Sequence, residues 1–328
     1  MLPSVSGVLF DDLLVKRHDP ATITAAFNSM KSGSVSLKVL FIKILLRCMA
    51  ALPLRAAHGV GALLGNVMWH VAKRSRRTAL RNLALCFPGM GEIARRQLAR
   101  ASMVETGKSI TELGALWFWP VKKTLSLIKQ VSGEHYIERA VSRGEGVIFV
   151  SPHLGAWELS GLYCAQIGGM TSLYRPPKLS GLDSMMRHAR ERGGARLVPT
   201  DASGVRALLQ GLRRGEFTGI LPDQDPGFGN GEFAPFFGVQ ANTMTLLSKL
   251  AFKSKAPVIL IYAQRLPKGE GFHLHLTPIA FDYQQSDMFA SLVTLNQSVE
   301  DAINELPQQY LWSYKRFKSR PLGEESLY

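Results

Sequence analysis

The sequence predicts an α/β domain with a largely parallel central sheet flanked by helices. From about residue 146 onwards, short apolar segments rich in β-branched residues alternate with amphipathic helical segments. This alternation is typical of strand–helix–strand units in a parallel sheet. The chain has 328 residues, 46% of them hydrophobic and 20% charged. It is therefore long enough to bury a sizeable core, and its composition excludes a disordered chain.

The expected elements follow one another in a regular order. Strands are expected at residues 146–150, 171–174, 196–199 and 217–221, with helices at residues 157–166, 182–192 and 205–213 between them. Two further strands, at residues 257–264 and 272–277, flank a Gly-containing turn and predict an antiparallel pair, and a helix over residues 287–305 closes the pattern. Before the first strand, residues 78–129 have helical periodicity with breaks at Phe87-Pro88-Gly89 and Trp119-Pro120.

The N-terminal part divides into a lead-in without clear periodicity, residues 1–36, and a helical segment over residues 37–72, before the α/β domain at residues 73–328. The apolar stretch Val39–Leu54 is shorter than the roughly 20 residues of a spanning helix and contains Lys43 and Arg47. A second apolar stretch, rich in Gly, then leads into a basic run. This pattern favours membrane attachment, with the cations at anionic headgroups. A buried helical hairpin with a solvated charge run would look the same, and spanning and interfacial attachment are not distinguished.

The excess of basic over acidic residues predicts an anionic partner. The formal net charge is +14, which fits nucleic acid, anionic lipid or an acidic protein. No nucleic-acid module is recognisable and the cations are not interleaved with stacking aromatics, so no nucleic-acid partner is expected. Two basic clusters are candidate contacts, although each could be a solvated face: Lys73, Arg74, Arg76 and Arg77, and Lys315, Arg316, Lys318 and Arg320.

Several other motifs are incomplete. Three widely spaced cysteines make no disulfide framework. His273 and His275 have no third ligand nearby, so no metal site is expected. Glu105 to Ser109 resembles half of a phosphate-binding loop, but Ser102 stands where its first Gly is required. No G-x-S-x-G elbow exists, which disfavours a serine hydrolase.

The most informative segment is the stretch from Ser151 to Glu158, which reads SPHLGAWE. It follows a predicted strand and precedes a helix, so it lies at a carboxyl strand end, where open α/β sheets bind ligands. His153 can act as a general base near neutral pH. Glu158 could accept a hydrogen bond from its other ring nitrogen if Gly155 lets the chain bend. A loop histidine beside a first-turn glutamate that stabilises the helix dipole is the alternative.

This H-x4-E pattern after a strand resembles the signature of glycerolipid acyltransferases. With Trp157 before the glutamate, it resembles the late lipid A biosynthesis acyltransferases, the lauroyl/myristoyl transferase family. Other segments match that family in the same order: Arg76-Arg77, Asn82-Leu83, Cys86-Phe87-Pro88, Tyr174 to Lys178, Leu221 to Gly227, Pro235 to Gly238, and the tail with Trp312 and Lys315 to Lys318. Tyr314 and Lys315 depart from the His-Arg of the family's tail, so no role is assigned to them.

The resemblance implies an acyltransferase that moves a fatty acyl chain from acyl carrier protein to a hydroxyl of a lipid A precursor, at the cytoplasmic face of the inner membrane. His153 would be the general base and Glu158 would orient and charge it. Arg175 or backbone N–H groups near Gly155 are candidate donors to the tetrahedral oxyanion. No cofactor is expected, because the thioester is already activated.

Further residues are expected at the same site. Asp223 and Gln224 end the strand at residues 217–221, on the same predicted sheet edge as His153, so we expect them at the mouth of the site, although Asp-Pro-Gly is also strong turn chemistry. With Arg175 and Trp157 they complete the predicted substrate-binding set. Phe236 and Phe237 could wall an acyl groove or form a buried aromatic pair.

Three rival functions stay open at this stage. The acceptor could be another glycolipid or an aminolipid, because acceptor choice depends on pocket shape. The chain could be a non-catalytic membrane protein that binds anionic lipid. The same histidine and glutamate could instead deliver water to the thioester, which would make the protein a hydrolase.

Overall fold

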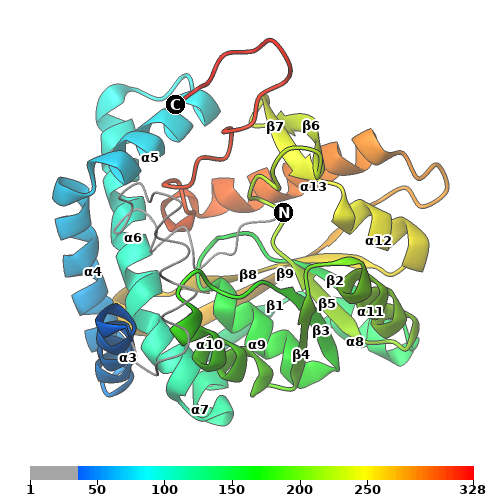
Figure 1. The fold of residues 1–328 in the computed structure, drawn as a ribbon, viewed down its shortest axis with the longest axis horizontal. Helices are drawn as coiled ribbons and strands as arrows, with labels where there is room; N and C mark the ends of the chain where they lie inside the picture. The colour runs from blue at the N-terminus through cyan, green and yellow to red at the C-terminus, as the bar shows by residue number, and fades with distance from the viewer. Residues whose placement is uncertain (1–35) are drawn as a thin grey trace.

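The computed structural model describes residues 36–328, so all but the last residue of the predicted lead-in lies outside the described residues. Within this range the chain forms a three-layer α/β structure, in which helices cover both faces of a seven-stranded sheet (Figure 1). A second sheet of two strands, β6 (Gly231–Phe236) and β7 (Val239–Met244), lies beside α13. The α/β class of the prediction is confirmed.

The central sheet has the order β1-β9-β8-β2-β5-β3-β4. Its strands are β1 (Ile128–Ser132), β2 (Val147–Val150), β3 (Met170–Tyr174), β4 (Ala195–Pro199), β5 (Phe217–Ile220), β8 (Val258–Arg265) and β9 (Phe272–Ile279). Strands β2, β3, β4, β5 and β8 are parallel, and β8 pairs antiparallel with β9. The predicted largely parallel sheet and its antiparallel pair are both confirmed.

Strand β2 lies at the centre of the sheet because both of its faces are apolar. Val147 and Phe149 pack into one hydrophobic cluster, and Ile148 and Val150 into the other. The first face is covered by α8 (His135–Ser142), α9 (Trp157–Ile167) and α10 (Asp183–Glu191), and the second by α11 (Ala202–Arg213), α12 (Leu246–Ser254) and α13 (Met288–Glu305). A strand buried on both faces has no polar alternation, as is usual in parallel sheets.

The helices that precede the sheet form a separate group along one side of the molecule (Figure 1). They are α3 (Leu37–Ala50), α4 (Leu54–Val71), α5 (Lys73–Cys86), α6 (Glu92–Phe118) and α7 (Val121–Leu125). Helices α4 and α6 approach closely because glycines face each other: a Cβ on Gly107 would lie 2.1 Å from the carbonyl oxygen of Gly61. Among residues 36–328, no helix combines the length and the apolar character that crossing a membrane requires.

Some elements differ from the prediction. The helical pattern was expected to continue to Lys129, but α7 ends at Leu125 and β1 follows as an edge strand whose mixed polar sequence does not alternate clearly. The β6–β7 hairpin was not predicted, because Pro235 inside β6 is unusual for a strand. Helix α12 was also not predicted. Short 3₁₀ turns at Ser180–Leu182, Pro267–Gly269 and Pro307–Gln309 complete the described chain.

Candidate active site

His153 and Asp223 meet where the neighbouring parallel strands β2 and β5 end. The Asp223 carboxylate accepts two hydrogen bonds from His153: one from ring Nδ1 at 2.8 Å and one from the backbone N–H at 2.9 Å. The loop after β2 is tied to β5 itself, because the Ser151 N–H donates to the Ile220 carbonyl at 3.0 Å. His153 is 1% exposed and Asp223 is 4% exposed, so the pair is shielded from bulk water.

The contacts of His153 define its tautomer. An ionised carboxylate only accepts hydrogen bonds, so Nδ1 carries the proton that it donates to Asp223. Ring Nε2 then has a free electron pair, which accepts from the side-chain amide of Gln224 at 3.2 Å. Burial by itself would raise the pKa of Asp223, but the charge and hydrogen bonds of His153 outweigh it and lower that pKa. The arrangement orients the imidazole ring with Nε2 toward Gln224.

Glu158 does not form the expected hydrogen bond with His153. Its two carboxylate oxygens accept from Arg190 of α10, at 2.5 Å to one guanidinium nitrogen and 3.2 Å to another, and the indole N–H of Trp117 lies 3.4 Å away. The reason is geometric: α9 begins at Trp157, its first turn directs Glu158 toward α10, and both ring nitrogens of His153 already have partners. The predicted His153–Glu158 contact is therefore wrong.

Arg190 is a site residue that the sequence analysis missed. Burial alone would lower the pKa of its guanidinium, but Glu158 outweighs burial and raises it, so the group stays charged beside the site. Its contact with Glu158 joins residues 32 positions apart, and no local motif signals it. The sequence indicated this contact only through the position of Arg190 on the buried side of the helix predicted over residues 182–192.

The loop that carries His153 is bent at Gly155, whose φ is +61°. The Gly155 N–H donates to the Gln309 carbonyl at 3.1 Å, and the Ala156 N–H donates to the Ala263 carbonyl at 2.8 Å. Both backbone donors near Gly155 are therefore already used within the protein. They do not fit the expected role of oxyanion donors.

A cavity of about 220 Å³ opens beside this pair. Its polar side includes His153, Glu158, Arg175, Arg190 and Gln224. The remaining lining is mostly apolar and comes from the sheet and from α6, α9 and α10, for example Phe149, Gly161, Leu162, Met170, Leu197 and Ile261. The site thus joins a basic and polar end to a hydrocarbon-like interior.

Trp157 also lines this cavity, on the helical side. Its ring centre lies 5.3 Å from that of His153. The indole nitrogen is buried and has no hydrogen-bond partner within the described part of the chain. Arg175 follows β3 directly and is an exposed residue of the cavity lining. All six predicted site residues therefore surround one cavity or touch His153.

Two other groups named from the sequence, the phenylalanine pair and the second basic cluster, lie outside the cavity lining. Phe236 is 1% exposed and packs against Phe237 and Phe317 in the core, outside the cavity lining. Arg316 is 2% exposed and donates to the Asn242 carbonyl at 2.7 Å, so this member of the second basic cluster is buried, whereas Lys318 is exposed. Between residues 36 and 328, no three His, Cys, Asp or Glu side chains are grouped as a metal site requires.

Comparison with known proteins identifies relatives over most of the chain. The family described as bacterial lipid A biosynthesis acyltransferase matches residues 30–319. The lipid A biosynthesis palmitoleoyltransferase of Escherichia coli K12 is 30% identical over 273 residues, which cover 82% of this chain and 87% of that protein. The lauroyltransferase of the same strain is 30% identical, over 84% of this chain and 90% of that protein. The myristoyltransferase of that strain is 27% identical, over 81% of this chain and 82% of that protein.

The bend at Gly155 generates a prediction about stability. A Cβ at this position would lie 2.0 Å from the Ala263 carbonyl oxygen, in addition to the strain of a positive φ. We expect Gly155→Ala to lower the free energy of unfolding by at least about 2 kcal/mol. Gly144→Ala is the matched control, because Gly144 has φ +66° but open space around a Cβ, so about 1 kcal/mol is expected. Equal losses in denaturant titrations of the two variants would contradict this account.

Proposed function

The chain belongs to the bacterial lipid A biosynthesis acyltransferase family, and from this premise we propose that it transfers a fatty acyl chain from acyl carrier protein to a hydroxyl group of a lipid A precursor. The observation that carries the proposal is the position of the buried His153–Asp223 pair at the polar end of an apolar cavity. Acyl transfer to a hydroxyl needs a base beside a site that holds a hydrocarbon chain.

The proposed mechanism uses the free electron pair on His153 Nε2. The acceptor hydroxyl replaces the Gln224 amide at this nitrogen and gives up its proton as its oxygen attacks the thioester carbonyl. Asp223, hydrogen-bonded to Nδ1, stabilises the imidazolium that forms. When the tetrahedral intermediate collapses, the carbon–sulfur bond breaks and the imidazolium returns its proton to the leaving thiolate.

The negative charge of the tetrahedral intermediate needs fixed donors. With the backbone N–H groups near Gly155 already paired, the candidates are side chains that line the cavity: Arg175, Arg190 and the indole N–H of Trp157. In this proposal Glu158 acts through Arg190, by holding its guanidinium beside the cavity. Glu158 is thus a paired carboxylate, but its partner is Arg190 and not the His153 that the sequence predicted.

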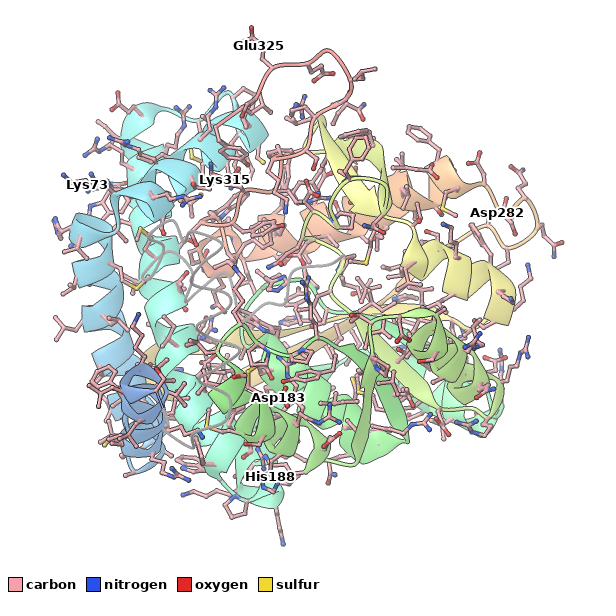
Figure 2. The ribbon with its side chains drawn as sticks, viewed as in Figure 1. Lys73, Asp183, His188, Asp282, Lys315 and Glu325 are labelled. Carbon is pink, nitrogen blue, oxygen red and sulfur yellow. The ribbon has the colours of Figure 1, made fainter. Side chains whose placement is uncertain are left out.

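The positive net charge of the chain fits the proposed donor and acceptor, which are both anionic. Of the first basic cluster, Lys73 and Arg77 are exposed. Figure 2 shows Lys73 where α4 meets α5, with Lys315 labelled toward the same end of the molecule. The Arg76 guanidinium instead donates to the Trp69 carbonyl at 2.8 Å. Acyl carrier protein is acidic, and we propose that it docks near this end.

The outer faces of α3 and α4 support attachment to the cytoplasmic face of the inner membrane. One face of each helix packs inward through residues such as Ile42, Leu46 and Met68. The other faces expose large apolar side chains, including Leu37 (82%), Phe41 (66%), Ile44 (52%), Leu63 (67%), Val67 (47%) and Val71 (65%). Apolar side chains next to Lys73 are the pattern of helices that lie in the interface.

The experiment that tests the proposed function is a mass spectrum of the lipid product. Purified protein in detergent is given acyl carrier protein thioesters and a lipid A precursor, and we expect a mass gain of one acyl chain. His153→Ala should lower the rate at least about 100-fold, the lower end of a general base's contribution. Its folding is checked by thermal unfolding.

Each alternative outcome of that experiment is informative. A folded His153→Ala protein with near-normal turnover would remove His153 from the mechanism. Free fatty acid that forms as fast as acylated lipid, with acceptor in excess, would indicate a hydrolase. No mass gain with folded protein would exclude this acceptor and direct the assay to total membrane lipid.

The cavity also predicts the choice of acyl chain length. Gly161 of α9 lines the cavity, and a Cβ there would meet no atom within 4 Å. We expect Gly161→Leu to fill this space and to lower kcat/KM for longer chains, by about fourfold for each methylene excluded, since a buried methylene contributes about 0.8 kcal/mol. Gly59→Leu on α4 is the control, because it makes the same change at an open helical position outside the cavity. An unchanged chain-length profile in Gly161→Leu would place the acyl chain elsewhere.

Membrane attachment is tested by polar substitutions on the exposed face. In the triple variant Phe41→Ser, Leu63→Ser and Val71→Ser, we expect at least a tenfold loss of binding to anionic vesicles in sedimentation, because three apolar side chains no longer enter the interface. The matched control changes exposed apolar side chains on other elements, Ile93, Phe289 and Leu322, to Ser. Equal loss in both triple variants would place the attachment elsewhere.

A further inference from the structure

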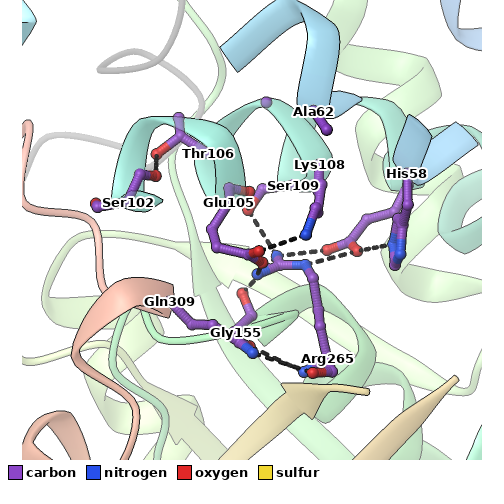
Figure 3. Close-up of polar contacts among 12 residues, drawn as sticks. His58, Ala62, Ser102, Glu105, Thr106, Lys108, Ser109, Gly155, Arg265 and Gln309 are labelled. Atoms are coloured by element: carbon purple, nitrogen blue, oxygen red, sulfur yellow. Dashed lines mark hydrogen bonds and ion pairs between the residues drawn. The ribbon is translucent and has the colours of Figure 1, made fainter. Parts of the chain in front are cut away.

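Behind the catalytic loop, the side chain of Arg265 lies at the centre of a buried network (Figure 3). Arg265 ends β8, and its side chain is 2% exposed. The guanidinium holds Glu112 of α6 through two nitrogens, at 2.8 and 2.7 Å. It also donates to the Ser109 hydroxyl at 2.6 Å. None of these residues lines the cavity, so the network lies outside the site already described.

The network extends to two helices and carries permanent charge. His58 of α4 lies 2.9 Å from the same Glu112 carboxylate, and Glu105 lies 3.5 Å from Arg265. Burial would raise the pKa of Glu112, but Arg265 and His58 outweigh it and lower the pKa to about 2. Glu112 is therefore ionised at neutral pH, and its attraction fixes the guanidinium in place.

The fixed guanidinium has one more acceptor, and that acceptor belongs to the catalytic loop. One Arg265 nitrogen donates to the carbonyl oxygen of Gly155 at 2.9 Å. Gln309 supports the same arrangement, because its side-chain amide exchanges two hydrogen bonds with the backbone of Arg265, at 2.9 and 3.0 Å, and its carbonyl accepts from the Gly155 N–H. Both backbone groups of Gly155 are thus held, two residues after His153.

We propose that Arg265 is a positioning residue of the proposed reaction: its guanidinium, locked by Glu112, holds the Gly155 carbonyl and so keeps the loop of His153 in its reactive geometry. This inference rests on the proposed function for its kinetic consequence. Arg265 touches neither the cavity nor His153 and acts only through Gly155. Because Glu112 is shared with His58, the same contact links the loop to α4.

The requirement is for arginine rather than for a positive charge. Two nitrogens of the guanidinium make these contacts: Nε donates to the Glu112 carboxylate, and Nη2 contacts that carboxylate, the Ser109 hydroxyl and the Gly155 carbonyl. The planar guanidinium holds Nε and Nη2 at a fixed separation, so it can grip Glu112 at two points while Nη2 also reaches Ser109 and Gly155. A lysine side chain is shorter and ends in a single nitrogen. It therefore cannot hold Glu112 at two points while it also contacts Gly155.

The test removes both members of the central ion pair, so neither is left as an unpaired buried charge, and Glu105 keeps its contact with Lys108 at 2.5 Å. The double variant Arg265→Met, Glu112→Leu replaces the ion pair with apolar side chains of similar size, which often preserves folding. We expect kcat to fall at least tenfold, because small displacements of catalytic groups are costly, with KM for both substrates within about threefold. Hydrogen exchange in peptides that cover residues 151–156 should become at least ten times faster, while exchange in α13 stays within twofold.

A control and a second variant complete the test. Ser109→Ala removes a contact of Arg265 but leaves those with Glu112 and Gly155, so exchange in the loop should stay within twofold. If the double variant does not fold, Arg265→Lys keeps the charge opposite Glu112 and should show the same faster exchange and lower kcat. Full kcat and full protection in Arg265→Lys would overturn the proposal.

Other results would also overturn it. Unchanged exchange in residues 151–156 of a folded double variant would show that Arg265 does not hold the loop, whatever happens to the rate. A higher KM with unchanged kcat would assign Arg265 to binding. Exchange is measured without substrate, so its result stands even if His153→Ala shows that the proposed reaction is wrong.

Discussion

The hydrogen bonds between Asp223 and His153 are the interaction on which the rest of the site depends. One carboxylate accepts from both the ring and the backbone of the histidine, at 2.8 and 2.9 Å. It thereby joins the loop after β5 to the loop after β2 and sets the tautomer of the imidazole. Both groups are buried, so water does not compete for these bonds. The positions of Gln224 and of the polar end of the cavity follow from this contact.

The two carboxylates near His153 have different partners and so different tasks. Asp223 is bound to His153, whereas Glu158 is bound to Arg190. A carboxylate beside an imidazole favours the protonated form of that ring, whereas a carboxylate beside a guanidinium fixes a positive charge that is always present. The polar side of the cavity therefore carries both an imidazole and a permanent cation.

Much of the fold could be predicted because its signals are local. The buried run of β2 is apolar at every position, and the segment that carries His153 lies between this strand and a helix. Since parallel strands end at one sheet edge, the meeting of Asp223 with His153 was within reach of the sequence. Edge strand β1 was missed because its exposed side chains leave no apolar pattern.

The contacts that could not be predicted join residues far apart in the chain. Arg190 lies 32 positions from Glu158, and Arg265 lies 153 positions from Glu112. Spacing in the sequence shows which side chains share an element, but the direction of the first turn of α9 decides which partner Glu158 meets. The burial of Arg316 could not be predicted for the same reason: a basic run looks solvated until the packing places one member against a buried carbonyl group.

The most direct test of this account is the tautomer of His153, measured by ¹⁵N NMR of protein labelled at its histidine rings and assigned by the signal lost in His153→Ala. The account predicts a proton on Nδ1 and none on Nε2 in the resting protein, a state that Glu158→Gln keeps and Asp223→Asn disturbs. A proton on Nε2 in the unaltered protein, or a tautomer that depends on Glu158 and not on Asp223, would contradict it.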